Sequence, residues 1–96
     1  MSREWPQGLE KYGETALFTE ESVPAKLTSV HNTKAGVWGK LCVEKGALNY
    51  IVSSREDAPE RIEAGQYGVI EPEVVHRVEL IGAVAFRVEF YRKSED

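Results

Sequence analysis

The stretch that decides the fold is FRVEFY, residues 86–91. Its apolar side chains, Phe86, Val88 and Phe90, alternate with the charged Arg87 and Glu89. An alternation with a period of two places one set of side chains on each face of an extended strand, and it is typical of an antiparallel strand with one buried face. We therefore predict a strand here that buries Phe86, Val88 and Phe90 and turns Arg87 and Glu89 outward.

The same period recurs along most of the chain. Further strands are expected at AKLTSVH (25–31), GKLCV (39–43), LNYIV (48–52) and HRVEL (76–80), with shorter ones near Ile62, at 67–71 and in TALF (15–18). Glycine-containing stretches separate them, namely EKGA (44–47), EAGQ (63–66) and IGAV (81–84), and we interpret these as tight turns in which glycine supplies a positive φ. Many short strands and no convincing helix predict an all-β sandwich or small barrel.

Length and composition narrow the class of protein. The chain has 96 residues, which predicts a single domain over 1–96, with 1–14 as an extended N-terminal arm and 92–96 as a charged tail. The net charge is −4, with acidic and basic residues interspersed, so nucleic acid is not an expected partner. No apolar run is long enough to span a membrane, and the first residues do not resemble an export signal.

These features favour a cytoplasmic protein. The single cysteine, Cys42, agrees with a reducing compartment because it has no internal partner for a disulfide. It lies in the apolar run KLCV, and we interpret it as a small buried hydrophobe rather than a reactive thiol.

Two histidines are the candidate functional residues. His76 begins the HRVEL run after the Glu-Pro corner at 71–72, and the alternation turns it inward with Val78 and Leu80. The same argument turns His31 inward at the end of the AKLTSVH run. Two imidazoles would then share one cavity, and neutral imidazole is the commonest protein ligand for transition metals.

Alternatives remain open for each of these residues. An inward histidine can be a hydrogen-bonded core residue, and Glu71 can be a third metal ligand or a solvated turn residue. The sequence contains no GxSxG, GxGxxG or GxxxxGK motif and no Cys-His pairing with a supporting motif, so it identifies no catalytic residue.

Two long segments, HNTKAGVWGKLCVEKGALNY (31–50) and EPEVVHRVEL (71–80) with FRVEFYRKSED (86–96), resemble the TehB/YeaR-like domain family. The resemblance implies a cupin-like double-stranded β-helix and a link to tellurite resistance or a related chemical stress. In this family methyl transfer belongs to a separate C-terminal domain that binds S-adenosylmethionine. We expect no S-adenosylmethionine site here, because the sequence lacks the glycine-rich strand-to-helix turn that would hold it.

The wider cupin pattern holds a metal with an HxH pair, a glutamate and a later histidine. His31 would match the first histidine and His76 the last, while Thr33 occupies the second position and Gly39 falls near the glutamate. A zinc, iron or nickel ion would then need Glu71, water or a bound anion to complete its coordination.

We therefore expect a binding or sensing module that holds a divalent metal or a small anion or other small molecule in its cavity. The alternative is a metal-dependent oxygenase or isomerase of the cupin type. A homodimer is also expected, because the exposed edges of such a sheet need covering.

Overall fold

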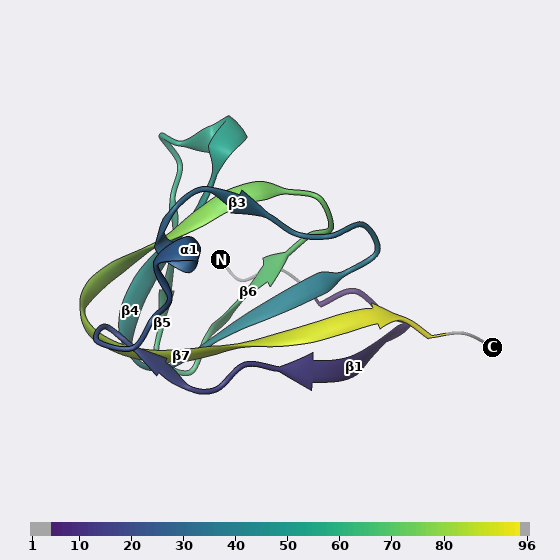
Figure 1. Cartoon of the computed structure of the whole chain (residues 1–96), viewed down its shortest axis with the longest axis horizontal. Helices are drawn as coiled ribbons and strands as arrows, with labels where there is room; N and C mark the ends of the chain where they lie inside the picture. Colours follow the sequence, from purple (N-terminus) through teal and green to yellow (C-terminus); the bar gives the residue numbers. More distant parts are fainter. Residues whose placement is uncertain (1–4, 95–96) are drawn as a thin grey trace.

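A computed structural model describes residues 5–94. Within these residues the chain forms seven strands of one antiparallel sheet, which confirms the all-β prediction (Figure 1). The elements in chain order are β1 (Leu9–Glu14), β2 (Phe18–Thr19), the helix α1 (Ala25–Thr28), β3 (His31–Asn32), β4 (Trp38–Val52), the 3₁₀ turn η1 (Ser53–Arg55), β5 (Glu60–Glu63), β6 (Tyr67–Ile70) and β7 (Val75–Lys93).

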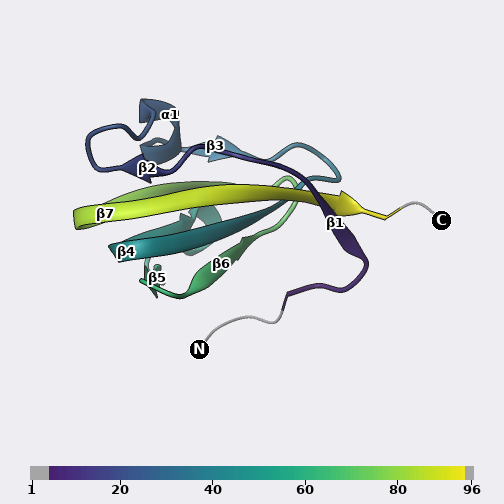
Figure 2. The same cartoon turned by 90° about the horizontal axis from the view of Figure 1, so that it is seen from below.

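The two long strands β4 and β7 form the centre of the sheet. They pair antiparallel from Trp38 opposite Tyr91 to Val52 opposite His76. The first half of β4 also pairs with β6 and its second half with β5, whereas β1, β2 and β3 all pair with β7. As a result, β2, α1 and β3 lie along one side of β7 and β5 and β6 lie beyond β4 (Figure 2).

Each of the two long strands contains a glycine with a positive φ. Gly46 of β4 has φ +74° and Gly82 of β7 has φ +64°. The β4–β7 register shifts between Val43 and Lys45 and again between Lys45 and Ala47. EKGA and IGAV are therefore bulges within continuous strands. The positive φ predicted for them is confirmed, but the prediction of hairpin turns there was wrong.

EAGQ is a true turn. It joins β5 to β6, and Gly65 within it has φ +86°. Two backbone hydrogen bonds hold this turn against the bulge of β4, from Ala64 N to Gly46 O (3.0 Å) and from Gly65 N to Val43 O (2.9 Å). The bend of the central strand and the β5–β6 turn thus stabilise each other.

The core lies on the inner face of the folded sheet. Both halves of β4 and both halves of β7 contribute alternate residues to it, as a period of two requires. The buried cluster comprises Leu41, Val43, Leu48, Tyr50, Ile62, Ile70, Val78, Val84, Phe86 and Val88. Phe86 is fully buried and its ring meets that of Phe18 of β2 edge-on, at 5.9 Å between centroids.

The structure corrects two expectations about the first third of the chain. AKLTSVH does not form one strand, because Ala25–Thr28 is a single helical turn that follows Pro24 and buries no residue. Residues 9–14 are extended, but as strand β1 paired with the end of β7 rather than as a separate arm.

Near the C-terminus, Arg92 and Lys93 belong to β7 instead of a tail. The parts of the predicted arm and tail at residues 1–4 and 95–96 lie outside the described residues.

Glu89 lies with Arg87 and Tyr91 on the face of β7 that points away from the core, as the alternation predicts. It is nevertheless buried, with only 7% of its surface exposed. Its carboxylate accepts hydrogen bonds from the Tyr91 hydroxyl (2.8 Å) and from Arg87 Nη2 (2.9 Å), and it lies 3.6 Å from Lys11 Nζ. Buried carboxylates persist when they are paired in this way.

None of the helices within residues 5–94 combines the length and the apolar character that crossing a membrane would require.

Candidate ligand-binding cavity

His31 and His76 are direct cross-strand partners in the β3–β7 ladder. Their ring centroids are 4.2 Å apart and their planes meet at 61°. Both rings line the same cavity, so the expectation that they turn toward one hollow is confirmed. The chain brings them together across 44 intervening residues because β3, only two residues long, pairs with the first residues of β7.

Backbone carbonyls set the tautomer of both rings. His31 Nδ1 lies 2.9 Å from the carbonyl oxygen of Ser29, and His76 Nδ1 lies 2.8 Å from that of Val74. A carbonyl oxygen only accepts hydrogen bonds, so each Nδ1 carries the proton and donates it. In the neutral ring the lone pair is then on Nε2, which leaves that atom available to a metal ion or to a hydrogen-bond donor.

His76 is held in its neutral form by burial. The residue is 2% exposed, and its ring lies 5.3 Å from the ring of Tyr50. Desolvation lowers the pKa of His76 below its ordinary value of 6.5, and the nearby His31 lowers it further, while the hydrogen bond to Val74 opposes the shift. At neutral pH this imidazole is therefore an uncharged group.

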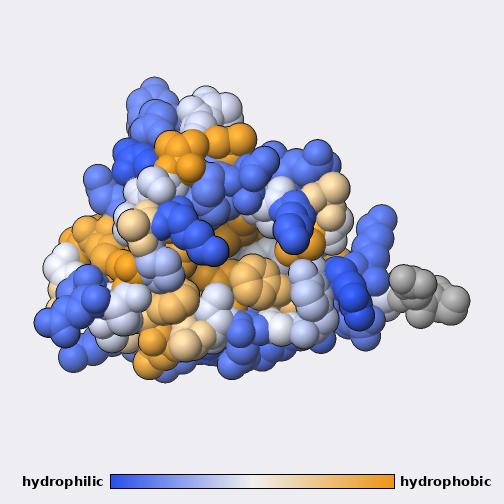
Figure 3. Space-filling view, viewed as in Figure 1, coloured by the Kyte–Doolittle hydropathy of each residue, from blue (hydrophilic) through white to orange (hydrophobic). Residues whose placement is uncertain are grey.

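The cavity that the histidines line has a volume of about 390 Å³. Residues 15–37, which carry β2, α1 and β3 and which we call the strap, form one wall. Apart from Thr15, the polar residues of that wall cluster in a short part of the strap, namely Lys26, His31, Asn32, Thr33 and Lys34. Figure 3 shows the molecule from the same side as Figure 1, with apolar surface in a hollow near the middle of the view and hydrophilic residues around it.

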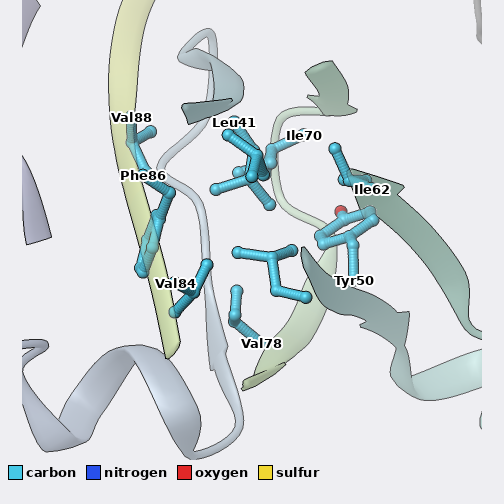
Figure 4. Packing of buried hydrophobic residues seen from close by; sticks show 10 residues of the cluster. Leu41, Tyr50, Ile62, Ile70, Val78, Val84, Phe86 and Val88 are labelled. Atoms are coloured by element: carbon cyan, nitrogen blue, oxygen red, sulfur yellow. The ribbon is translucent and has the colours of Figure 1, made fainter. Parts of the chain in front are cut away.

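The opposite wall comes from the sheet and is apolar apart from His76 and the phenol of Tyr12. It includes Leu41 of β4, Ile70 of β6, and Val78, Phe86 and Val88 of β7. Figure 4 shows these side chains gathered in the interior of the molecule. The cavity is therefore a continuation of the hydrophobic core that opens toward a polar strap.

Glu71 does not join the two histidines. It is exposed, and it is absent from the lining of the cavity. No carboxylate belongs to the lining, and across residues 5–94 no three or more His, Cys, Asp or Glu side chains lie together as metal ligands would. The structure thus assembles two of the three residues that we considered as metal ligands.

A family model for the TehB-like domain matches residues 14–88. The chain belongs to this family. It is 32% identical over 90 residues to the probable S-adenosyl-L-methionine-dependent methyltransferase TehB of Haemophilus influenzae strain KW20, with 88% of this chain and 32% of TehB covered. It is 30% identical over 99 residues to the uncharacterized protein YeaR of Escherichia coli K12, with 94% of this chain and 83% of YeaR covered.

Solved structures agree with this assignment. A crystal structure of a protein from E. coli K12 superposes with a TM-score of 0.88 at 28% identity, covering 97% of this chain and 99% of that one. The crystal structure of H. influenzae TehB superposes with a TM-score of 0.81 at 30% identity, covering 91% of this chain and 32% of TehB. This TehB-like domain therefore spans about a third of the length of the TehB proteins that it matches.

The two positions that a cupin would fill with further metal ligands also line the cavity of this TehB-like domain. They are Thr33 and Gly39, a hydroxyl and a residue without a side chain. A Cβ at position 39 would lie 3.1 Å from Cβ and Cδ1 of Ile70, so a larger residue there would have to displace that side chain. The local packing of this domain thus favours glycine where the cupin pattern has a ligand.

Sequence reasoning missed the two lysines that line the cavity, Lys26 and Lys34. Lys34 could have been found, because it follows His31 by only three residues in HNTK. A strand of two residues keeps it close to the His31 imidazole. Lys26 could not, because the stretch that carries it was interpreted as a strand and is a helix.

Proposed function

We propose that this TehB-like domain is a binding module that holds a small anion in its cavity against the imidazoles of His31 and His76. The observation that carries the proposal is the set of polar groups in the lining. Two lysines make the lining cationic and two imidazoles lie beside them, with no carboxylate in the lining, in a chain whose net charge is −4. A cavity with low-dielectric walls and groups of one sign attracts ligands of the opposite sign.

The tautomers add a condition to anion binding. Each Nδ1 already donates to a carbonyl, so an anion can accept a hydrogen bond from Nε2 only after that atom gains a proton. Binding should therefore take up a proton and become tighter as the pH falls. The other titratable side chains in the surroundings are Lys26, Lys34 and Tyr12 in the lining and Tyr50 beside His76, and none of them is a carboxylate.

The experiment is calorimetric titration of the full chain with tellurite, selenite and sulfite. Tellurite is included because of the resistance with which the family is associated. We expect about tenfold tighter binding at about pH 6 than at about pH 8, and a heat that depends on the ionisation enthalpy of the buffer, as proton uptake requires. Heats equal to those of dilution at both pH values, for these oxyanions and for the carboxylates considered below, would refute the proposal.

Two variants at one position sharpen this test. His76→Gln keeps an amide near the place of Nε2, whereas His76→Asn keeps a donor near the place of Nδ1 that can still reach the Val74 carbonyl. Anion binding should survive in part in the glutamine variant and be lost in the asparagine variant. Equal affinity in both would mean that Nε2 does not contact the anion.

A metal ion is the second candidate ligand, and the tautomers favour it. Histidines that bind metals usually donate the other ring nitrogen to a carbonyl or a carboxylate, which fixes the ring, and both rings here have that support. Two imidazoles leave zinc, iron or nickel short of donors, so water or a bound anion would complete the coordination, with Glu71 reaching it only if the loop moved.

The pH dependence separates the two candidates. A metal ion competes with protons for Nε2, so its affinity falls as the pH falls, which is opposite to the dependence for an anion. Metal analysis and titration of the protein against a His31→Ala, His76→Ala double variant complete the comparison. Equal metal content and affinity in the two proteins would remove the metal candidate.

The proposal is binding rather than catalysis. An oxygenase or isomerase of the cupin type needs a third protein donor and an open coordination position, and residues 5–94 contain no group of three such donors. The module would act in the cytoplasm, in keeping with its single cysteine. A homodimer is part of the same proposal, and light scattering coupled to size exclusion tests it.

A further inference from the structure

We infer that the preferred ligand of this cavity is a small organic acid, with an apolar body of several carbon atoms and one acidic group, rather than an inorganic oxyanion. This inference rests on the proposed anion site. It adds the chemical class of the ligand, which the histidines alone do not define.

The first observation is that the cavity has two chemically different walls. The lysines, His31, Asn32 and Thr33 all come from residues 26–34 of the strap. The sheet wall carries aliphatic and aromatic side chains, and its titratable groups are the buried imidazole of His76 and the phenol of Tyr12. A ligand that satisfies both walls must itself have a polar end and an apolar end, because an apolar wall gains free energy only when apolar surface covers it.

The second observation is size. A molecule of liquid water occupies about 30 Å³, so a cavity of about 390 Å³ has room for about thirteen waters or for a ligand with a similar number of non-hydrogen atoms. An inorganic oxyanion fills less than half of this space and would leave the sheet wall in contact with water. A carboxylic acid with five to eight carbon atoms has about seven to ten non-hydrogen atoms and occupies roughly half to three quarters of it.

The third observation concerns the side chains that would contact the acidic group of the ligand. The two Nε2 atoms belong to rings 4.2 Å apart, and the lysines of the strap lie along the same cavity. One carboxylate has two oxygens, so a single acidic group can face both rings at once. The lysine ammonium groups then add long-range attraction, which is sensitive to salt.

The test is calorimetric or ligand-observed NMR titration of the full chain with straight-chain carboxylates from acetate to octanoate. Each added methylene should tighten binding about fourfold until the cavity is full, so hexanoate, with four more methylenes, should bind about 250-fold more tightly than acetate. Hexanamide, which has the same body and no charge, should bind at least about tenfold more weakly than hexanoate. Tellurite, selenite and sulfate should bind more weakly than hexanoate.

A matched pair of variants tests where the acid binds. Lys34→Gln and Lys93→Gln remove the same charge from two exposed lysines, but only Lys34 lines the cavity. We expect hexanoate affinity to fall about threefold to tenfold in Lys34→Gln at low salt and to stay unchanged in Lys93→Gln. Both side chains are exposed, so both variants should fold, and a thermal melt checks this.

The outcomes separate this inference from the proposed function. Inorganic oxyanions that bind as tightly as hexanoate, or an affinity independent of chain length, would overturn the inference and leave the anion site in place. An equal loss of affinity in both lysine variants would also overturn it, because the acid would then be responding to overall charge. If no anion of either kind binds, the proposed function fails as well.

Discussion

Gly46 of β4 lies directly against the backbone of Ala83 in β7. A Cβ at position 46 would stand 2.1 Å from the Ala83 carbonyl oxygen and 3.2 Å from the Val84 Cα. This contact is where the two central strands bend together, and it requires a residue that has no side chain and accepts a positive φ.

We predict that Gly46→Ala is strongly destabilising. Alanine would have to adopt the left-handed backbone conformation of Gly46, which costs about 1–2 kcal/mol. Its Cβ would also overlap backbone atoms that cannot rotate away. The free energy of unfolding should therefore fall by about 3 kcal/mol or more. Gly82→Ala is the control, since it has φ +64° but nothing within 4 Å of the added Cβ. Chemical denaturation should show a loss of only about 1 kcal/mol for the control, and equal losses would contradict the clash.

The second prediction concerns His76 and the pH dependence of stability. Burial lowers the pKa of His76 in the folded protein below the value of 6.5 that it has when unfolded. The unfolded chain therefore binds more protons in this range, and the free energy of unfolding decreases as the pH falls below about 6.5. Its contribution is fully present above that pH.

Denaturation at a series of pH values between about 7.5 and about 5.5 measures this effect, since the acidic side chains titrate mostly below that window. The variant His76→Phe keeps a ring in the core and removes the titrating group, so its stability should change less over the same range. A wild-type profile no steeper than that of the variant would show that His76 is not the cause.

How far the sequence predicts this structure depends on the range of the interactions involved. The inward faces of HRVEL and FRVEFY follow from strand geometry alone, and both are correct for the buried Val78, Phe86 and Val88. The alternation places Glu89 on the outer face but does not predict its burial. That burial depends on hydrogen bonds from Tyr91 and Arg87 and on Lys11 of β1, and no period in a sequence reveals which side chains pair.

The candidate site shows the same limit. His31 was predicted to face inward from a strand that does not exist, and it does so instead through the two-residue pairing of β3 with β7. The positive φ at Gly46 and Gly82 was predicted, yet their role as bulges was not, because a glycine looks the same in a turn and in a bend of a long strand. Glu71 adjoins the correct corner but is exposed.

The third prediction concerns Glu89. The desolvation of this carboxylate raises its pKa, but the hydrogen bonds from Tyr91 and Arg87 and the charge of Lys11 outweigh this and hold the pKa below the ordinary value of 4.5. Its stabilising contribution is therefore present above about pH 4.5 and is lost as the pH falls through the lower pKa of the folded state. Glu89→Gln should cost about 1–3 kcal/mol at neutral pH and flatten the acid limb of the stability profile, as denaturation below about pH 5 would measure.

The conservative variant Tyr91→Phe removes one hydrogen bond to Glu89 and leaves those from Arg87. We expect it to lower the free energy of unfolding by less than Glu89→Gln does. A larger loss in the tyrosine variant would mean that the Tyr91 hydroxyl stabilises the fold by more than its hydrogen bond to Glu89.

The fourth prediction is that the thiol of Cys42 is alkylated slowly in the folded protein. Partial burial raises the pKa of this thiol above its ordinary value, and the neighbouring charge of Glu89 raises it further, while Arg87 opposes the shift. Only the thiolate reacts with alkylating agents, so the folded protein should react about tenfold or more slowly than the unfolded chain at about pH 8. Because Glu89→Gln removes a negative charge near the sulfur, it should speed the reaction, whereas the distant Glu56→Gln should not.

The fifth prediction concerns how the strap is held to the sheet. Glu20, which follows β2, accepts a hydrogen bond from the backbone N–H of Val84 in β7 at 3.0 Å, and this bond lowers the pKa of its carboxyl. Glu20→Ala should remove the acceptor and speed hydrogen exchange at the Val84 amide, with a smaller increase along the strap. Glu20→Gln keeps an oxygen in the same place and should preserve most of the protection. If both variants exchange at the wild-type rate, then the β2 pairing at Phe18–Phe86 and Thr19–Ala85 suffices to hold this wall of the cavity closed.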